Sequence, residues 1–161
     1  MAEKAFSVTM TGVDELSKKL EGLSYDIQKK GGRFALRKAA QVIRDQAKSN
    51  AGAIDDPKSR EDIVKNITER WGSKYNKRTG DLMFRVGVQG GAGGSTKSSE
   101  LADLPGGDTR HWRFVEFGTE KMAPRPFMVP AMEQSAQAAT DKFISTMGPA
   151  IDRALKRSGG S

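Results

Sequence analysis

HWRFVEFGTEKMAPRPFMVPAM, residues 111–132, is the densest apolar and aromatic stretch of a chain that is otherwise polar and rich in Gly, Lys and Arg. Residues 111–117 alternate as a strand does and carry large apolar groups on both faces, which predicts an interior strand. Gly118 permits the positive φ of a turn that ends this strand. Pro124 and Pro126 favour an extended approach and then a first helical turn. The stretch is therefore predicted to turn a central strand into the last helix of the fold.

One carboxylate in residues 111–132, which we call the corner, needs a partner. By alternation Glu116 shares a face with Trp112 and Phe114, so it is predicted to be partly buried. A buried carboxylate has to be paired, and Arg125 is the first candidate partner and Arg85 the second. An ion pair that braces the corner is favoured over a catalytic acid, because no second carboxylate lies at a complementary position.

The composition bounds the class of protein. The 161 residues are enough for one domain, residues 1–161, and a hydrophobic fraction of 36% predicts a modest core. Because cysteine is absent, disulfides and thiolate metal sites are excluded. No apolar run approaches the roughly 20 residues of a membrane span, and the N-terminus lacks the long apolar core of a signal peptide. We expect a soluble protein, made in the cytoplasm, without a membrane partner.

The net charge of +7 and the pI near 9.7 raise the question of a nucleic-acid partner. Acidic and basic residues are interspersed along nearly the whole chain, and no tract of five or more bases occurs. The charge pattern therefore favours a weak attraction to DNA that passes nearby. A basic DNA-binding accessory protein remains the alternative function.

Ahead of the corner the sequence predicts one strand and two helices. Residues 5–11 alternate and are β-branched enough for a short strand. A helix over about residues 12–30 is expected to end at Gly31–Gly32. A second helix over about residues 33–49 buries small side chains that permit close approach of another element. Its predicted inner face consists of Leu36, Ala39, Ala40, Ile43 and Ala47.

The middle of the chain is predicted to form a hairpin. Residues 58–66 have the pattern of a short helix capped by Ser59. Strand patterns follow at residues 66–76 and 82–89, joined by a turn over residues 77–81 that contains a hairpin-like Gly.

The second half of the chain begins with a long Gly- and Ser-rich segment. Residues 90–110 have no core-forming periodicity, so a functional or mobile loop is expected there. After the corner comes a helix with an inner face of Met132, Ala136, Ala139 and Phe143. Gly148–Pro149 is expected to end or kink this helix near Met147, and residues 157–161 to form a flexible tail.

Strands grouped after helices indicate an α+β fold. We predict a small, mostly antiparallel sheet with two N-terminal helices and one long C-terminal helix packed on it.

Candidate catalytic and binding motifs are weak. A Ser–His–Asp site would have to use His111, the single histidine, but no Ser stands in a nucleophile-elbow context, so a capping or surface role is favoured. Residues 91–98, GAGGSTKS, nearly match a P-loop but carry Thr96 where the last Gly is required, which favours a mobile loop. We expect no enzyme activity and no catalytic, cofactor-binding or metal-binding residues.

The corner resembles a specific family. Its EFGT, RPF and PA elements are similar to the signature of the tail-component family of long-tailed bacteriophages, whose members are described as tail-completion, tail-terminator or head–tail joining proteins. The matching residues are Glu116, Phe117, Gly118 and Thr119, then Arg125, Pro126 and Phe127, then Pro130 and Ala131. Earlier elements fit in the same order: Gly12 to Leu16 as a helix start, an Ala-rich second helix, and Thr79 to Leu82. The long loop at residues 90–110 departs from the family pattern, so no role is carried over to it.

The resemblance implies a virion structural protein of the tail or neck, assembled in the host cytoplasm. Similar proteins form a ring, usually a hexamer, at the head-proximal end of the tail tube, where they stop tube growth and join the tail to the head connector. The implied partners are further copies of the chain, the tail tube protein and the head connector or stopper protein, with DNA passing through the lumen without specific binding. The resemblance does not decide between three positions in the neck, those of a tail terminator, a stopper and a tail-completion factor. The motif residues are expected to have structural roles.

Overall fold

The computed structural model describes residues 10–54, 58–90 and 97–158. The strand predicted at residues 5–11, the near-P-loop segment at 91–98 and the tail at 157–161 lie largely outside these ranges.

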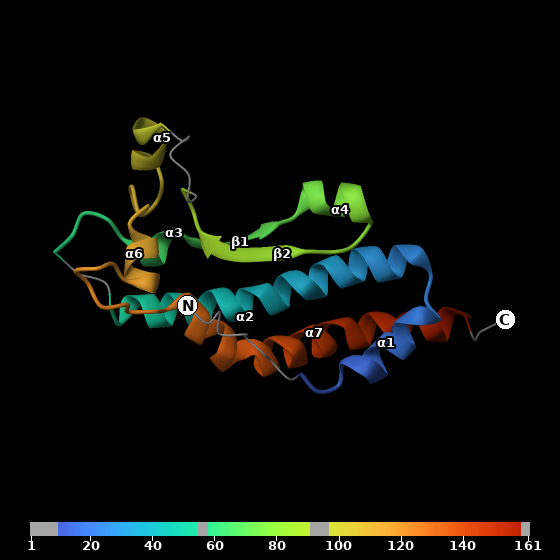
Figure 1. The fold of residues 1–161 in the computed structure, drawn as a ribbon. Coiled ribbons are helices and arrows are strands. Elements are labelled where there is room, and N and C mark those ends of the chain that lie inside the picture. The colour runs from blue at the N-terminus through green and yellow to red at the C-terminus, as the bar shows by residue number, and fades with distance from the viewer. Residues whose placement is uncertain (1–9, 55–57, 91–96, 159–161) are drawn as a thin grey trace.

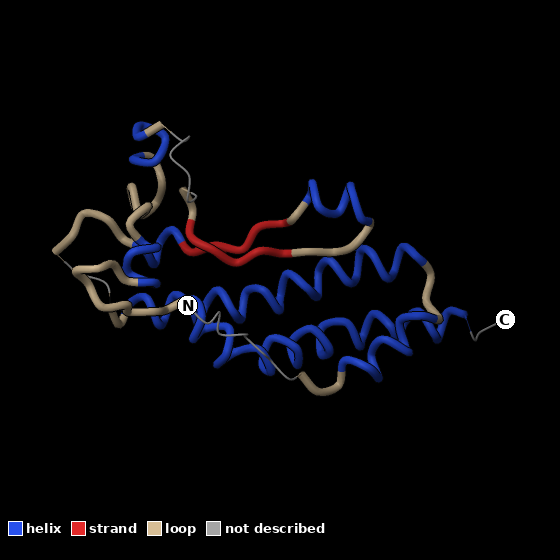
Figure 2. The backbone as a smooth tube through the Cα atoms, in the orientation of Figure 1, coloured by secondary structure: helices blue, strands red, loops and turns tan. Residues whose placement is uncertain are grey.

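Two long helices and a hairpin make the framework (Figures 1 and 2). The elements, in chain order, are α1 (Val13–Glu21), the π-helix η1 (Ile27–Gly31), α2 (Gly32–Gly52), α3 (Ile63–Asn66), β1 (Ile67–Trp71), α4 (Ser73–Thr79), β2 (Phe84–Val88), α5 (Ser98–Ala102), α6 (Trp112–Phe117) and α7 (Met128–Ser158). Helices α2 and α7 lie side by side, with the sheet on the far side of α2 and α1 against α7 (Figure 1). The fold is α+β, as predicted, and mostly helical.

The close pairing of α2 and α7 follows from small side chains on both helices. On α2 the buried residues include Ala35, Ala39, Ala40, Ala47 and Ala51. On α7 they include Ala131, Ser135, Ala136 and Ala139. Small residues let two helix backbones approach. In the predicted inner faces the alanines are buried as expected, whereas the larger side chains are only half-buried: Leu36, Ile43, Met132 and Phe143.

Two apolar clusters hold the framework together. The first joins α2, α3, β1 and the start of α7, and its buried members are Ala47, Ala51, Ile63, Ile67, Phe127 and Ala131. The second joins α1, α2 and the end of α7, through Leu16, Ala35, Met147 and Ile151. The core is therefore modest and divided between the two ends of α2 and α7.

The sheet consists of β1 and β2 paired antiparallel, with Ile67 opposite Val88 and Arg70 opposite Arg85. Side chains alternate between faces along a strand. Ile67 and its same-face neighbours turn toward α2, whereas Arg70 and Arg85 turn away from it. The second predicted strand is confirmed in its central residues, and the first in its first half.

The first predicted helix has the wrong boundary. Helix α1 ends at Glu21, and the chain then continues through η1 directly into α2, so Gly31 and Gly32 do not end a helix. Their role is steric. A Cβ on Gly31 would lie 3.2 Å from Met147 Cε, and one on Gly32 would lie 2.9 Å from Leu82 Cδ1. These glycines let neighbouring elements approach the backbone.

Two predictions in the middle of the chain are also wrong. Ser59 does not cap α3; the carboxylate of Asp62 does, by accepting the N–H of Lys65 at 3.3 Å. The first strand ends at Trp71 instead of residue 76. The Gly72 N–H still donates across the hairpin to the Met83 carbonyl at 2.9 Å, but the chain turns into a helix at Ser73. Helix α4 then fills the connection between the strands.

The long C-terminal helix does not end at Gly148–Pro149. Helix α7 runs from Met128 to Ser158 with Pro149 inside it. Met147 and Ile151 on either side of Pro149 are buried in the second cluster. Their burial maintains the helix across a position where a proline removes one backbone hydrogen bond.

Part of the segment predicted as a coreless loop is folded. Residues 98–102 form α5, and Leu101 is only 1% exposed. Buried Asn66 organises the chain between α5 and α6: its side-chain amide donates to Gly107 O at 2.9 Å and to Thr109 Oγ1 at 2.8 Å, and its Oδ1 accepts the Gly106 N–H at 2.8 Å. Asn66 precedes β1 directly in the sequence. A prediction that rests on the spacing of apolar residues gives no role to such a polar residue.

Candidate functional site: the corner and the sheet

The segment predicted as a central strand is the helix α6, Trp112–Phe117. Its helical bonds include Val115 N–H to His111 O and Gly118 N–H to Phe114 O. Trp112 and Val115, three residues apart, both pack on the first apolar cluster. Residues spaced by three lie on one helix face, so the apparent alternation of this segment is the inner and outer face of a short helix.

The turn after α6 is formed as predicted. Gly118 has φ 75° and ψ 179°, and a Cβ there would lie 2.8 Å from the Met122 carbonyl oxygen. The Thr119 N–H donates to Met122 O at 2.9 Å, and the Arg125 N–H donates to Val115 O at 2.8 Å. The chain thus folds back along α6 before α7 begins.

Glu116 is the brace of the corner, but its partner is not an arginine. Its side chain is 3% exposed. The carboxylate accepts the backbone N–H groups of Phe127 at 2.8 Å, Met128 at 3.0 Å and Val129 at 3.0 Å. These are donors at the first turn of α7, which have no partner within the helix and lie at the positive end of its dipole. The predicted ion pairs with Arg125 or Arg85 are wrong.

The structure divides the predicted motif residues into two groups. Glu116, Gly118 and Phe127 form the interior of the corner; Phe127 is fully buried and its ring meets Trp112 edge-on at 6.4 Å. The remaining residues are exposed or partly buried at its surface: Phe117, Thr119, Arg125, Pro126 and Pro130. The conformation of the corner therefore depends on the first group, while the second group is available for contacts with other proteins.

The outer face of α6 is apolar and faces solvent. Phe114 is 58% exposed and Phe117 is 66% exposed. They are three residues apart on one helix and so lie on the same side of it. Exposed aromatic side chains of this size, adjacent on a rigid element, are typical of contact surfaces between proteins. Sequence reasoning missed this surface because an interior strand would have buried both rings.

A polar cluster centred on one buried carboxylate fixes the sheet on α2. The Glu69 carboxylate, with a side chain 6% exposed, accepts hydrogen bonds from Arg44 Nη1 at 2.6 Å, Gln41 Nε2 at 3.1 Å and Arg37 Nε at 3.4 Å. Burial alone would raise the pKa of Glu69, but the hydrogen bonds from Gln41 and Arg44 outweigh it and lower the pKa to about 2. The folded state thus holds this carboxylate ionised.

Stability is therefore expected to fall at acid pH through Glu69. Its folded pKa lies below the ordinary value of 4.5, so its contribution is complete above about pH 4.5 and is lost as pH falls toward about 2. The contribution is on the order of 2 kcal/mol. Urea unfolding between these pH values should show the loss in the wild type. The Glu69→Gln variant should be less stable at neutral pH, and its free energy of unfolding should change less with pH over the same range. An equal pH dependence in the wild type and the variant would contradict the assignment to Glu69.

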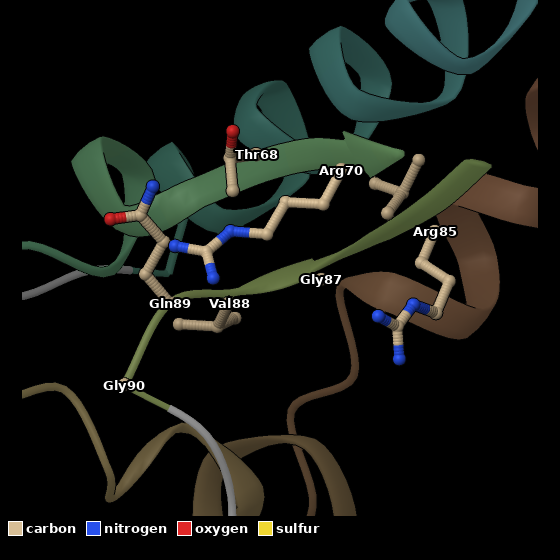
Figure 3. A pocket seen from close by; sticks show the side chains of 8 residues that line it. Thr68, Arg70, Arg85, Gly87, Val88, Gln89 and Gly90 are labelled. Atoms are coloured by element: carbon tan, nitrogen blue, oxygen red, sulfur yellow. The ribbon is translucent and has the colours of Figure 1, made fainter. Parts of the chain in front are cut away.

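The opposite face of the sheet carries a like-charge pair (Figure 3). Arg70 and Arg85 are direct cross-strand partners and both are exposed. They border a shallow pocket of about 320 Å³ that Thr68, Gly87 and Gln89 also line. Like charges directly opposite each other on a sheet are destabilising.

Replacing one of these arginines by an acid should stabilise the isolated protein. Arg85→Glu places opposite charges across the strands and is expected to raise the free energy of unfolding by about 0.5 kcal/mol. Thermal unfolding at low and high salt measures the effect, which should shrink as salt rises. Arg85→Gln is the control and should give a smaller gain. A lower melting temperature for Arg85→Glu would show that the pair does not repel.

His111 lies near one carboxylate, with its Nδ1 3.6 Å from Glu61 Oε2. In the part of the chain that the structure describes, no group of three or more His, Asp and Glu side chains is placed to hold a metal ion. Within the same residues, none of the helices combines the length and the apolar character needed to cross a membrane.

A comparison with protein families gives a match. Residues 14–118, more than half of the chain, match the family described as "Bacteriophage HK97-gp10, putative tail-component". The chain belongs to this tail-component family. The match runs from α1 to Gly118 at the end of α6, so it contains the sheet, Glu116 and the exposed Phe114 and Phe117. The later motif residues, from Thr119 to Pro130, lie beyond it.

No curated protein and no solved structure matched this tail component. Family membership supports a structural role in a bacteriophage tail, and with it a location in the virion and assembly with other virion proteins.

Proposed function

We propose that this tail component forms a ring at the head–tail junction, where it ends the tail tube and joins the tail to the head connector. The role is structural and not enzymatic. Its partners in the neck are further copies of the chain, the tail tube protein and the connector or stopper protein, and the 161 residues act as one domain. The family match and the exposed α6 face support this proposal.

The observation that carries the self-association is the pair Phe114 and Phe117. Both rings are more than half exposed on α6, while the helix itself is held by Trp112 and Val115 in the core and by the Glu116 cap on α7. A rigid, exposed aromatic pair loses little side-chain entropy when it is buried by a partner. We assign this face to the contact with the neighbouring copy.

Ring formation is tested with purified full-length protein, alone and mixed with isolated tail tubes. Mass photometry and negative-stain microscopy should show discrete closed rings or caps on tube ends. The double variant Phe114→Ser/Phe117→Ser should remain monomeric with an unchanged melting temperature. Phe34→Ser is the matched control, because Phe34 is also 58% exposed but lies on α2; it should assemble normally. A protein that neither associates nor adds to tubes would refute the proposal.

The position in the neck requires whole virions. Cross-linking mass spectrometry should join this chain to the tube protein on one side and to a connector or stopper protein on the other. Cross-links to the tube protein alone would indicate a terminator, and links confined to the distal tail would exclude the head–tail junction.

A DNA-binding accessory protein is the second candidate, and the Arg70–Arg85 pair is the observation in its favour. Such a protein would bind DNA as a monomer with an affinity that falls steeply as salt rises. Discrete rings that persist without DNA would favour the structural role.

A further inference from the structure

Arg70 and Arg85 have no anionic neighbour in the described part of the chain. None of the ion pairs in these residues includes either arginine. The nearest carboxylate along β1, Glu69, turns to the opposite face of the sheet and is occupied by Arg44 and Arg37. The fold therefore holds two cross-strand arginines in solvent without an ion-pair partner among the described residues.

The other groups on this face are small and polar. Thr68 offers a hydroxyl and Gln89 an amide, and Gly87 leaves its backbone uncovered, with nothing within 4 Å of the place where a Cβ would be. Figure 3 shows these groups arranged along the two strands beside the arginines. Arginine, hydroxyl, amide and backbone donors are the groups that proteins use to bind nucleic-acid phosphates.

The surroundings add positive charge. Between residues 67 and 89 the basic residues are Arg70, Lys74, Lys77, Arg78 and Arg85, and the acidic residues are Glu69 and Asp81. Lys74 and Lys77 are exposed on α4, which connects the two strands. Because Glu69 faces α2, Asp81 is the one acidic residue of this segment that is exposed beside the five basic ones.

An acidic protein segment is the competing partner, and the face fits it less well. Hot spots of interfaces between proteins are aromatic residues or arginines that sit in well-packed, desolvated pockets. The residues at the centre of this face are Arg70, Arg85, Thr68 and Gly87; none is aromatic, and both arginines lie exposed on an open sheet surface. A phosphate backbone requires charge and hydrogen-bond donors only.

We propose that the outer face of the β1–β2 sheet binds the phosphate backbone of DNA without reading its sequence. Arg70 and Arg85 each contact a phosphate, and the bound anions remove the repulsion between the two side chains. The inference rests on the proposed function only for the source of the DNA, which is the genome as it passes the neck; the binding itself belongs to the single chain.

The test is a salt titration of binding to short fluorescein-labelled DNA duplexes of two unrelated sequences, followed by fluorescence anisotropy. The full-length wild type should bind both duplexes equally. In Arg70→Gln/Arg85→Gln the slope of log K against log salt should become shallower by about two per bound chain, and affinity at low salt should fall about tenfold or more. The control Arg153→Gln/Arg157→Gln removes the same charge from exposed positions on α7 and should keep the wild-type slope.

Three outcomes would overturn the inference. Equal losses in both double variants would show that only net charge matters. An unchanged slope in the sheet variant, or loss of binding to poly-glutamate but not to DNA, would assign the face to another partner. The sheet variant should still form rings in mass photometry. A wild type that binds DNA through these arginines but never forms rings would contradict the proposed function and leave this inference standing.

Discussion

Replacing Glu116 by Ala is expected to lower the free energy of unfolding by about 3 kcal/mol, because the substitution removes the acceptor for three N–H groups. These are the backbone donors of Phe127, Met128 and Val129. Hydrogen bonds to a charged acceptor are among the stronger ones, and buried donors left without a partner incur their desolvation cost. Chemical denaturation of the purified monomer measures the loss, and hydrogen exchange should accelerate first at residues 127–129.

Three variants distinguish the cap from an ion pair and from a general charge effect. Glu116→Gln keeps one acceptor oxygen without the charge and should lose about half as much stability. Glu120→Ala removes an exposed carboxylate from the same turn and should be neutral. Arg125→Ala keeps the backbone bond from Arg125 N–H to Val115 O and should also be nearly neutral. If Arg125→Ala were as damaging as Glu116→Ala, the brace would be an ion pair.

Gly106→Ala is the second large expected effect, again about 3 kcal/mol or more. A Cβ at residue 106 would lie 1.9 Å from the Asp62 carbonyl oxygen and 3.0 Å from Asn66 Cγ. The first of these atoms belongs to the backbone, which is also fixed at this point by a hydrogen bond: the Asp62 N–H donates to Gly106 O at 2.9 Å. The methyl group can be accommodated only by separating the loop from α3.

The matched control is Gly148→Ala. Nothing lies within 4 Å of a Cβ at Gly148, and alanine is the better helix former, so this variant should gain up to about 1 kcal/mol. Thermal unfolding of both variants tests the contrast. Exchange of the Gly106 and Gly107 amides should rise only in Gly106→Ala; equal melting temperatures for the two variants would mean that the contact is not formed.

Sequence patterns predicted the parts of this fold that depend on one-dimensional periodicity. The small-residue face of α2, the start of α7 and the second strand are of this kind, because burial of one face imposes a period of 3.6 or 2 on the sequence. The turn at Gly118 was equally readable, because a positive φ favours glycine there.

The failures have a common physical cause. The six residues of α6 are too few to separate a period of 2 from one of 3.6, and large apolar side chains at four of them suit a strand buried on both faces as well as a helix. The two interpretations differ in their faces: a strand sets Trp112 opposite Val115, whereas the helix places both of them inward. The partner of Glu116 was missed because nearly every residue has a backbone N–H group, so the sequence does not indicate which of these groups a carboxylate will bind. The steric roles of Gly31, Gly32 and Gly106 could not be predicted either, since each depends on atoms of residues far away in the sequence.

The Glu116 cap has a mechanical consequence. Helix α7 contains 31 residues and spans about 45 Å at the rise of an α-helix. One end is fastened to α6 by the carboxylate, and the other is packed against α1 through Met147 and Ile151. A force applied to α6 is thus passed along one continuous helix to the opposite end of the molecule, so a load on α6 would be borne by the whole subunit.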